Sequence, residues 1–307
     1  MSQPRRVIPG MTYLLTRRCG RREFRLTPGG ELPLLMAYAI AVYSVRYGVG
    51  VHAVMCMPNH YHLVASDPRG RIGDFLRDLN ALTGRATNAE QHRWEAVWSS
   101  QRSSQVALVD REDVWRKLVY TLTNPAAADL VDRLSHWPGF KTRPVDVIRP
   151  PVVVRRPDLR FFTERSTMPI EAVLELTVPE AMGDMAPKVY AEELQRRVAA
   201  REAELRAERR AAGRKLMDRR KFRCLAHRAS PSSKAVRRGR DPAIAAKDTA
   251  TRIEALRALR AFRDAYREAL EKWRSDELPV TFPYGTFKMR SYPGVVVGLP
   301  PPSLLAV

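Results

Sequence analysis

Two histidines separated by one residue are the side chains of this sequence best suited to chemistry. His60 and His62 lie in the segment 54–64, VMCMPNHYHLV, which otherwise has the composition of a strand. Because side chains alternate across a strand, both imidazoles are expected on one face and Tyr61 on the other. Neutral imidazole is the commonest metal ligand, so the pair indicates a metal site. The same spacing is also typical of histidines that only form hydrogen bonds, and a further ligand is needed to decide between the two.

A second segment, 110–125, DREDVWRKLVYTLTNP, predicts a helix that begins at Asp110 as N-cap. At 100° per residue, Tyr120 lies about 160° from both Leu118 and Leu122 and therefore points away from the core. Lys117 and Asn124 share its face, at spacings of three and four residues. A phenol can act as a nucleophile, an amide oxygen can bind a cation and a lysine can bind a phosphate. The alternative is a surface tyrosine, followed by an asparagine that caps a new helix at Pro125.

Together these segments resemble the HUH single-strand transposases, and in particular the REP-associated tyrosine transposases. The similarity covers residues 10–140 and rests on three motifs, which are MPNHYHLV (57–64), WSSQR (98–102) and YTLTNP (120–125). The resemblance implies that Tyr120 is the nucleophile and that His60, His62 and Asn124 hold a divalent ion, Mg or Mn. Members of the family usually have Arg and Gly after the Asn-Pro pair, where this chain has Ala127 and Asp129. That departure affects a DNA contact or a packing detail and leaves the catalytic set intact.

The charge of the chain predicts a polyanionic partner. The 307 residues include 53 Lys and Arg against 33 Asp and Glu, a net charge of +20. Residues 196–240 alone hold 17 basic and 4 acidic side chains. Nucleic acid is the leading candidate for a protein this basic, although charge runs are also typical of solvated helix faces and tails. The side chains predicted to contact DNA are Lys117, Arg17, Arg18, Arg21, Arg22 and Arg102.

The cysteine spacing and the hydropathy of the chain indicate its cellular compartment. The three cysteines, Cys19, Cys56 and Cys224, show no spacing of a zinc site or a disulfide framework. The longest apolar-rich run, 32–45, is too short to cross a bilayer, so no membrane partner is expected. A reducing cytoplasm is predicted, and the resemblance implies a bacterial, nucleoid-associated protein.

The first 140 residues predict an α+β fold of ferredoxin-like type, in which an antiparallel sheet carries helices on one face. Its expected elements are strands at 11–18, 51–57, 60–66 and 106–109 and helices at 32–47, 72–82 and 110–125. This order, strand-helix-strand-strand-helix-strand, places the histidine strand centrally and lets the tyrosine helix pack against it.

The remainder of the chain predicts a mostly helical, basic region. We divide it into a Pro-rich linker or extended packing segment (141–186), a basic helical region (187–275) and an irregular tail (276–307). Helices are expected at 187–217 and from Asp241-Pro242 to Trp273. The spacing of Val198, Leu205 and Ala212 is also compatible with a coiled-coil homodimer.

Three functions are compatible with these patterns. The first is a metal-dependent transposase that cuts and rejoins single-stranded or hairpin DNA, at palindromic repeats, through a 5′-phosphotyrosine. The second is a domesticated protein that binds single-stranded DNA or RNA without cutting it. The third is a nuclease that uses water, with Tyr120 in a structural role. The presence of all four residues of the catalytic set favours the first.

Overall fold

The fold is built on a central sheet of five strands, described here from a computed structural model that covers residues 3–218, 226–231 and 242–300. The strands occur in the order β2-β3-β1-β4-β7, with β1 at the centre and β3, the histidine strand, beside it. The first four are antiparallel to their neighbours, and the short β7 joins β4 in parallel. Their bounds are β1 (Met11–Arg18), β2 (Gly50–Met57), β3 (His60–Asp67), β4 (Ser104–Leu108) and β7 (Ile244–Ala245). This is the strand order of a ferredoxin-like α+β fold, and it confirms the predicted fold class.

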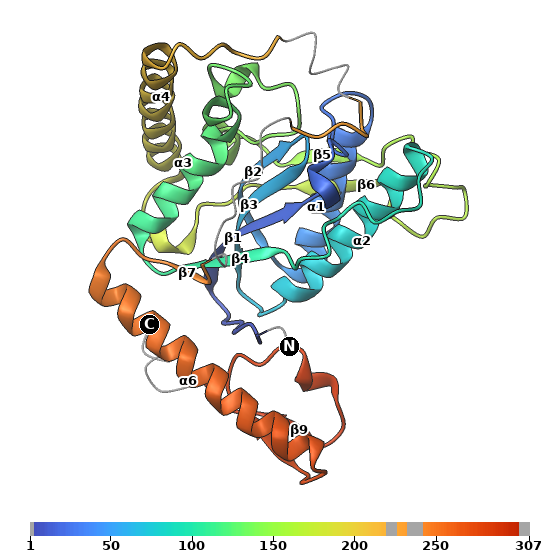
Figure 1. Ribbon diagram of the computed structural model, residues 1–307, viewed down its shortest axis with the longest axis vertical. Helices are drawn as coiled ribbons and strands as arrows, with labels where there is room; N and C mark the ends of the chain where they lie inside the picture. The colour runs from blue at the N-terminus through green and yellow to red at the C-terminus, as the bar shows by residue number, and fades with distance from the viewer. Residues whose placement is uncertain (1–2, 219–225, 232–241, 301–307) are drawn as a thin grey trace.

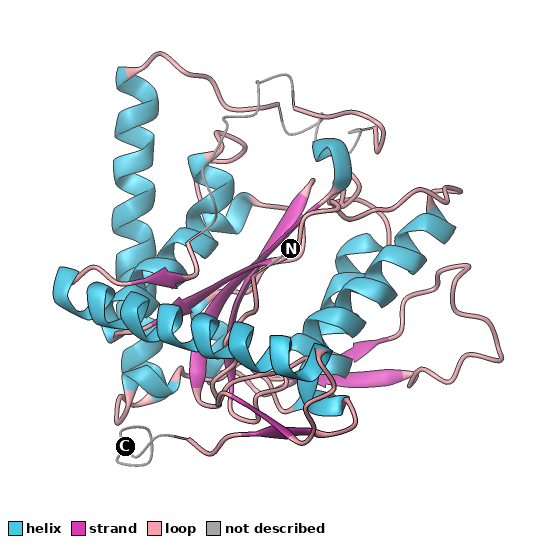
Figure 2. Ribbon diagram, turned by 60° about the horizontal axis from the view of Figure 1, so that its bottom comes forward, coloured by secondary structure: helices cyan, strands magenta, loops and turns pink. Residues whose placement is uncertain are grey.

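Alternating side chains give the sheet two apolar faces. Tyr13 and Leu15 of β1 pack in one buried cluster with α1 (Leu32–Tyr47) and α2 (Ile72–Glu90). Leu14 points the other way, into a cluster shared with α3 (Arg111–Ala127) and α4 (Pro187–Ala211). The two helices of the ferredoxin-like unit therefore lie on one face as predicted, while α3 and α4 cover the opposite face. Figures 1 and 2 show the strands between these two helical layers.

Helix α1 ends where the chain must turn back into β2. Gly48 takes a left-handed conformation, φ 65°, and its N–H donates to the carbonyl oxygens of Ser44 and Val45. A side chain at this position would be strained by the left-handed conformation, which favours glycine. The tight turn brings the chain directly to the start of β2.

Helix α3 begins at the predicted cap. The Asp110 carboxylate accepts a hydrogen bond from the Asp113 N–H at 2.7 Å. Pro125 lies within the last turn of the same helix, which continues to Ala127. Asn124 therefore belongs to the tyrosine helix and does not cap a new one. Val114, Leu118 and Leu122 are buried against the sheet, as their spacing predicts.

The second half of the chain adds further strands and helices to the sheet and its helical layers. A hairpin of β5 (Val152–Arg155) and β6 (Glu171–Leu174) contributes Val154 and Leu174 to the cluster of α1. Helix α6 (Thr249–Arg274) packs on the parallel pair β8 (Val280–Phe282) and β9 (Val295–Val297). Short 3-10 helices complete the described elements, at Gly20–Arg22 (η1), Leu134–His136 (η2), Pro144–Ile148 (η3), Glu180–Met182 (η4) and Met289–Ser291 (η5).

Two predicted helix boundaries in this half are wrong. Helix α6 begins after its N-cap Asp248, later than the predicted start, because the Ala107 N–H donates to the Ala243 carbonyl and the following residues form β7. Helix α4 ends at Ala211. Much of the predicted basic stretch after it, 219–225 and 232–240, lies outside the described residues, as does Asp241.

Nowhere in the described chain does a helix combine the length and apolar character needed to cross a bilayer.

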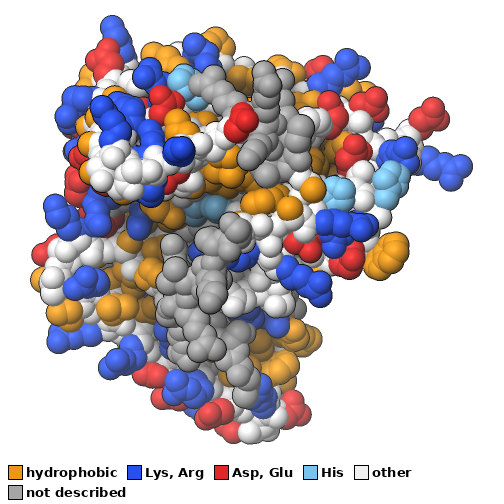
Figure 3. Space-filling model, turned by 45° about the horizontal axis from the view of Figure 1, so that its top comes forward, with side chains coloured by type: hydrophobic (Ala, Val, Ile, Leu, Met, Phe, Trp, Pro, Cys, Tyr) orange, Lys and Arg blue, Asp and Glu red, His pale blue; other side chains and the backbone are white. Residues whose placement is uncertain are grey.

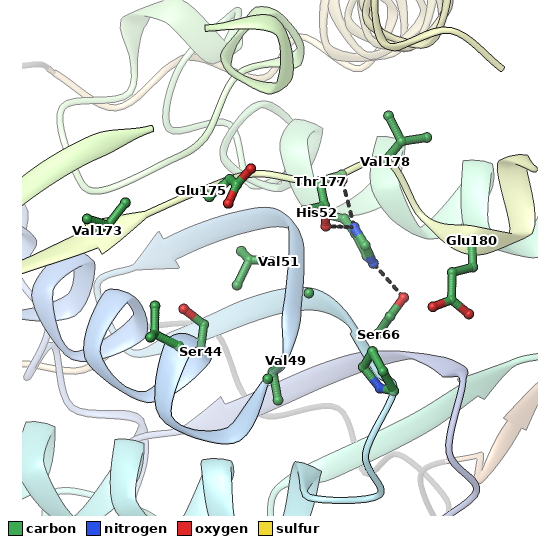
Figure 4. A pocket seen from close by; sticks show the side chains of 14 residues that line it. Ser44, Val49, Val51, His52, Ser66, Val173, Glu175, Thr177, Val178 and Glu180 are labelled. Atoms are coloured by element: carbon green, nitrogen blue, oxygen red, sulfur yellow. Dashed lines mark hydrogen bonds between the residues drawn. The ribbon is translucent and has the colours of Figure 1, made fainter. Parts of the chain in front are cut away.

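A buried polar network closes the end of the sheet near Gly50. His52 is 6% exposed, and its Nδ1–H donates to the Thr177 carbonyl oxygen at 2.8 Å. Its Nε2 therefore accepts from the Ser66 hydroxyl at 2.6 Å. A pocket of about 390 Å3 opens beside this network, and Figure 4 shows His52 between its two partners at the wall of the pocket. Burial lowers the pKa of His52 to about 4, so this imidazole stays neutral in the folded protein at neutral pH.

This shift predicts a loss of stability in mild acid. The pKa of His52 falls from 6.5 when unfolded to about 4 when folded. The unfolded chain therefore binds more protons between these values, and the stabilisation present above pH 6.5 is lost as the pH falls toward 4. Between pH 7 and 4.5 this one group should lower the free energy of unfolding by about 2.5 kcal/mol. Denaturant unfolding at both pH values should show a smaller drop for His52→Asn, and the wild-type drop for the exposed control His92→Asn. Equal drops in all three proteins would contradict the assignment.

Candidate active site

The two histidines lie in rows of side chains that cross the sheet. In the antiparallel register, His62 is opposite Thr16 of β1 and Met55 of β2. His60 is opposite Arg18 and Met57 in the next row on the same face. Both imidazoles therefore point to the face that α3 covers, and the centroids of their rings lie 4.8 Å apart. The sequence predicted this common face from the spacing alone.

Hydrogen bonds orient both imidazole rings. The Nδ1–H of His60 donates to the Asn59 side-chain oxygen at 2.7 Å, which leaves the lone pair of the neutral ring on Nε2. The Nδ1 of His62 is bonded to the Thr16 hydroxyl, also at 2.7 Å, where a hydroxyl can serve as donor or acceptor. With both Nδ1 atoms engaged, Nε2 is the atom of each ring suited to bind a metal. Such outer hydrogen bonds commonly fix the orientation of metal-binding histidines.

Tyr120 of α3 lies directly beside this pair. Its ring meets that of His62 edge to face, with centroids 5.2 Å apart and planes at 71°. The side chain is 39% exposed, so solvent and a ligand can reach the phenol. Lys117, one turn earlier, places its Nζ 5.6 Å from the centroid of the Tyr120 ring. Burial lowers the pKa of Lys117, because partial removal from water disfavours its charged form.

The remaining predicted ligand is Asn124, which is half-buried one turn after Tyr120. Within the part of the chain that the structure describes, no three His, Cys, Asp or Glu residues gather as a metal cluster would. A metal at the histidine pair would therefore need an amide, hydroxyl, water or phosphate oxygen to complete its shell. His60 and His62 can supply two imidazole ligands, and Asn124 remains the predicted source of an amide oxygen.

The predicted arginines divide between different surfaces. Arg18 is next to His60 across the β1–β3 pair and so lies on the face of Tyr120. Arg17 points to the opposite face, over the Trp98 ring at 5.9 Å. Arg21 and Arg22 lie in η1 with left-handed φ angles of 51° and 60°. Arg102 is exposed in the loop before β4. Arg18 and Lys117 therefore share the surface of the histidines and the tyrosine, and the Arg22 carbonyl accepts a hydrogen bond from Asn59 beside His60.

A groove of about 480 Å3 runs between α3 and α4 and has Tyr120 in its wall. Trp115 stacks on Tyr190 of α4, with ring centroids 5.2 Å apart, and this contact holds the two helices together. Arg196, Arg197 and Arg201 of α4 also line the groove, and each is paired with a glutamate. Figure 3 shows Lys and Arg side chains gathered at the upper left, over the C-terminal end of α4. The sequence predicted a basic helix here, although the pairing of these groove arginines lowers their net charge.

Two residues that orient the site were not predicted from the sequence. Asn59 directly precedes His60, and its position next to a histidine was a usable signal. Thr16 is 46 residues from His62, and the β1–β3 register that pairs them could not be read from the sequence. Both act on the imidazoles rather than on a ligand.

Comparison with known proteins finds similar solved structures, among them the following two. A REP-associated tyrosine transposase bound to a REP hairpin matches with a TM-score of 0.41 and 24% identity, over 48% of this chain and 87% of its own. A candidate transposase from Deinococcus radiodurans R1 matches with a TM-score of 0.27 and 18% identity, over 34% of this chain and 85% of its own. No family model and no curated protein matches the chain.

The hydrogen bond between Thr16 and His62 gives a prediction about the site. Thr16→Val keeps the shape of the side chain but leaves a buried imidazole nitrogen without its partner. The free energy of unfolding should fall by about 1–3 kcal/mol in denaturant titrations. The Nδ1 resonance of His62 should also move in nitrogen NMR spectra. Thr16→Ser retains the hydroxyl and should preserve that resonance, and a valine variant with an unchanged His62 spectrum would refute the bond.

Proposed function

We propose that this protein is a metal-dependent single-stranded DNA transesterase of the transposase type, with Tyr120 as its nucleophile. The proposal rests on one observation above others. A partly exposed phenol contacts His62, and His62 and His60 form a pair whose Nδ1 atoms are both hydrogen-bonded. An accessible phenol beside two oriented imidazoles suits phosphoryl transfer better than it suits a structural role.

His60 and His62 would hold the divalent ion, Mg or Mn, with the Asn124 amide as a third ligand. When bound, the ion would polarise the phosphodiester and offset the negative charge that repels a nucleophile. The imidazoles would bind through Nε2, because Asn59 and Thr16 occupy the Nδ1 atoms. The remaining positions would be left to water and to DNA oxygens.

Tyr120 would attack the phosphorus in line with the bond to the 3′-oxygen. Its phenol is 39% exposed and would lose its proton to solvent as the new O–P bond forms. The bond from phosphorus to the 3′-oxygen breaks, and that oxygen takes up a proton and leaves as a 3′-hydroxyl. The product is a 5′-phosphotyrosine. Because the phosphodiester energy is kept in this link, the 3′-hydroxyl of a second strand can reverse the reaction and join new ends without ATP.

Arg18 and Lys117 would hold the phosphate during this step. Arg18 is opposite His60 on the same face of the sheet, and Lys117 flanks the Tyr120 ring. Cations on both sides of the scissile phosphate would fix its position against the phenol. A single strand or a hairpin end suits this arrangement better than a duplex, because a second strand would obstruct the in-line approach of a helix-borne phenol. Palindromic repeat DNA that folds into hairpins is therefore the substrate class we propose.

The nucleophile is tested by Tyr120→Phe, which removes only the hydroxyl. Incubation with labelled single-stranded DNA and a divalent ion, followed by denaturing electrophoresis, should show a covalent adduct for the wild type and none for the variant. Binding should be retained, because the ring still packs on His62. Tyr292→Phe is a matched control, since Tyr292 is also 39% exposed. Cleavage without an adduct in the wild type would point to water as nucleophile, and binding without cleavage would identify a non-cutting nucleic-acid-binding protein.

The metal site is tested by His60→Ala and His62→Ala, singly and together. Each single variant should lose metal-dependent cleavage, and the double variant should be little worse, because ligands of one ion are strongly non-additive. Asn124→Ala should be milder, with a loss of about tenfold, since water can replace one amide oxygen. Adduct formation and manganese binding by calorimetry would both be measured, with His92→Ala as an exposed control. Manganese binding at wild-type strength in both single variants would place the metal elsewhere.

A further inference from the structure

Three arginines from distant parts of the chain meet at the turn before β4. Arg5 donates a hydrogen bond from Nη2 to the Ser103 carbonyl, and Arg17 donates one from Nη1 to the Gln101 carbonyl. Arg102 lies between these two anchoring residues in the sequence. The segment Gln101–Ser103 therefore holds two guanidinium groups beside the residue that carries the third. We call Arg5, Arg17 and Arg102 the arginine cluster.

The arginine cluster has no acidic counterpart among the residues that the structure describes. Several other arginines are paired with carboxylates, as Arg93 is with Glu23 and Arg143 with Asp146. Members of the cluster form no such ion pair within residues 3–218, 226–231 and 242–300. The Nε of Arg17 is buried and has no hydrogen-bond partner in this part of the chain. A buried donor without a partner is costly in a folded protein, and a bound anion would satisfy it.

The positive charges of the arginine cluster also repel one another. Burial lowers the pKa of Arg5, and the neighbouring charges of Arg102 and Arg17 lower it further. Burial lowers the pKa of Arg17 as well. Guanidinium groups remain protonated in proteins, so this repulsion is not removed by loss of a proton. An anion bound among the three would remove it, and the forked donors of arginine match the oxygens of a phosphate.

The position of the arginine cluster relates it to the candidate active site. Arg17 follows Thr16 in β1, and Thr16 is bonded to His62 on the opposite face of the sheet. In Figure 1 the N-terminal segment lies between the sheet and α6. On that side Tyr266 of α6 lies close enough to Arg102 for its positive charge to act on the phenol. That charge lowers the pKa of Tyr266, against the larger effect of burial, which raises it. The cluster is thus close to the histidine pair along the strand but separated from Tyr120 by the thickness of the sheet.

We infer that Arg5, Arg17 and Arg102 form a second anion site, which binds backbone phosphates of the nucleic acid away from the phosphate at Tyr120. That the ligand is a nucleic acid rests on the proposed function. That the ligand is an anion rests on the arginine cluster alone. A strand that passes the β4 end of the sheet would be held here while its scissile phosphate lies on the other face. The site would supply affinity and position without taking part in the chemistry.

The test compares the double variant Arg5→Gln/Arg102→Gln with wild type. Binding of a fluorescent oligothymidine is measured by anisotropy over a range of salt concentrations. Loss of two phosphate contacts should weaken binding roughly tenfold at low salt and reduce the magnitude of the logarithmic salt slope by about 1.4. Arg77→Gln is the control, because Arg77 is exposed and paired with Asp74 and Asp78, and it should behave as wild type. Melting of each protein without ligand confirms that it is folded.

A second measurement separates this site from the proposed chemistry. Inorganic tripolyphosphate should raise the melting temperature of the wild type and of Tyr120→Phe, and raise that of the double variant much less. If the wild type forms no adduct with DNA but this difference is found, the proposed reaction fails and the anion site stands. A double variant that matches Arg77→Gln in salt slope and in its response to tripolyphosphate would overturn the inference.

Discussion

The antiparallel pairing of β1 with β3 is the constraint on which the candidate site depends. This register places Thr16 opposite His62 and Arg18 opposite His60, on the face covered by α3. Because side chains alternate with a period of two, a slip of one residue would turn both imidazoles into the cluster of α1 and α2. Tyr61 and Leu63 are buried in that cluster, so a slip would also turn them out of it toward the α3 face and put the histidines in their place. The burial of the apolar residues of β3 therefore fixes the orientation of its polar ones.

The second requirement is the placement of α3. Leu118 and Leu122 are buried against the sheet, and Trp115 stacks on Tyr190 of α4. Since Tyr120 points away from these anchors, it lies at the margin of the interface, where its ring touches His62 while the residue stays 39% exposed. A helix anchored on both sides has little freedom to rotate, and a fixed phenol needs little further ordering before it reacts. The α3–α4 contact thus contributes to the geometry of the site although α4 supplies none of the predicted ligands.

Much of the first half of the fold could be predicted from local patterns, and the reasons for the exceptions are physical. The alternation of side chains predicted the strands and the face on which each residue lies. Asp110 predicted the start of α3, and the spacing of His60 and His62 predicted their common face. Thr16 could not be assigned, because its role depends on a strand register between residues far apart in sequence. The start of α6 was placed too early, because residues with helical character were used to extend the sheet as β7. The arginine cluster likewise depends on three segments that only the folded chain brings together, although Arg17 and Arg102 had been expected to contact DNA.

The pairing of β7 with β4 also has a consequence for the order of synthesis. Ala107 and Leu108 bond to Ile244 and Ala245, so one edge of the sheet is completed by residues made roughly 140 positions later. At about 5–20 residues per second, a ribosome would need on the order of 10–30 s to supply that strand. During this interval the backbone N–H and C=O groups along the outer edge of β4 would be unpaired on the nascent chain. Because β4 spans only Ser104–Leu108, few such groups are exposed. The brevity of β4 thus limits the unpaired backbone that other chains could meet before the last strand arrives.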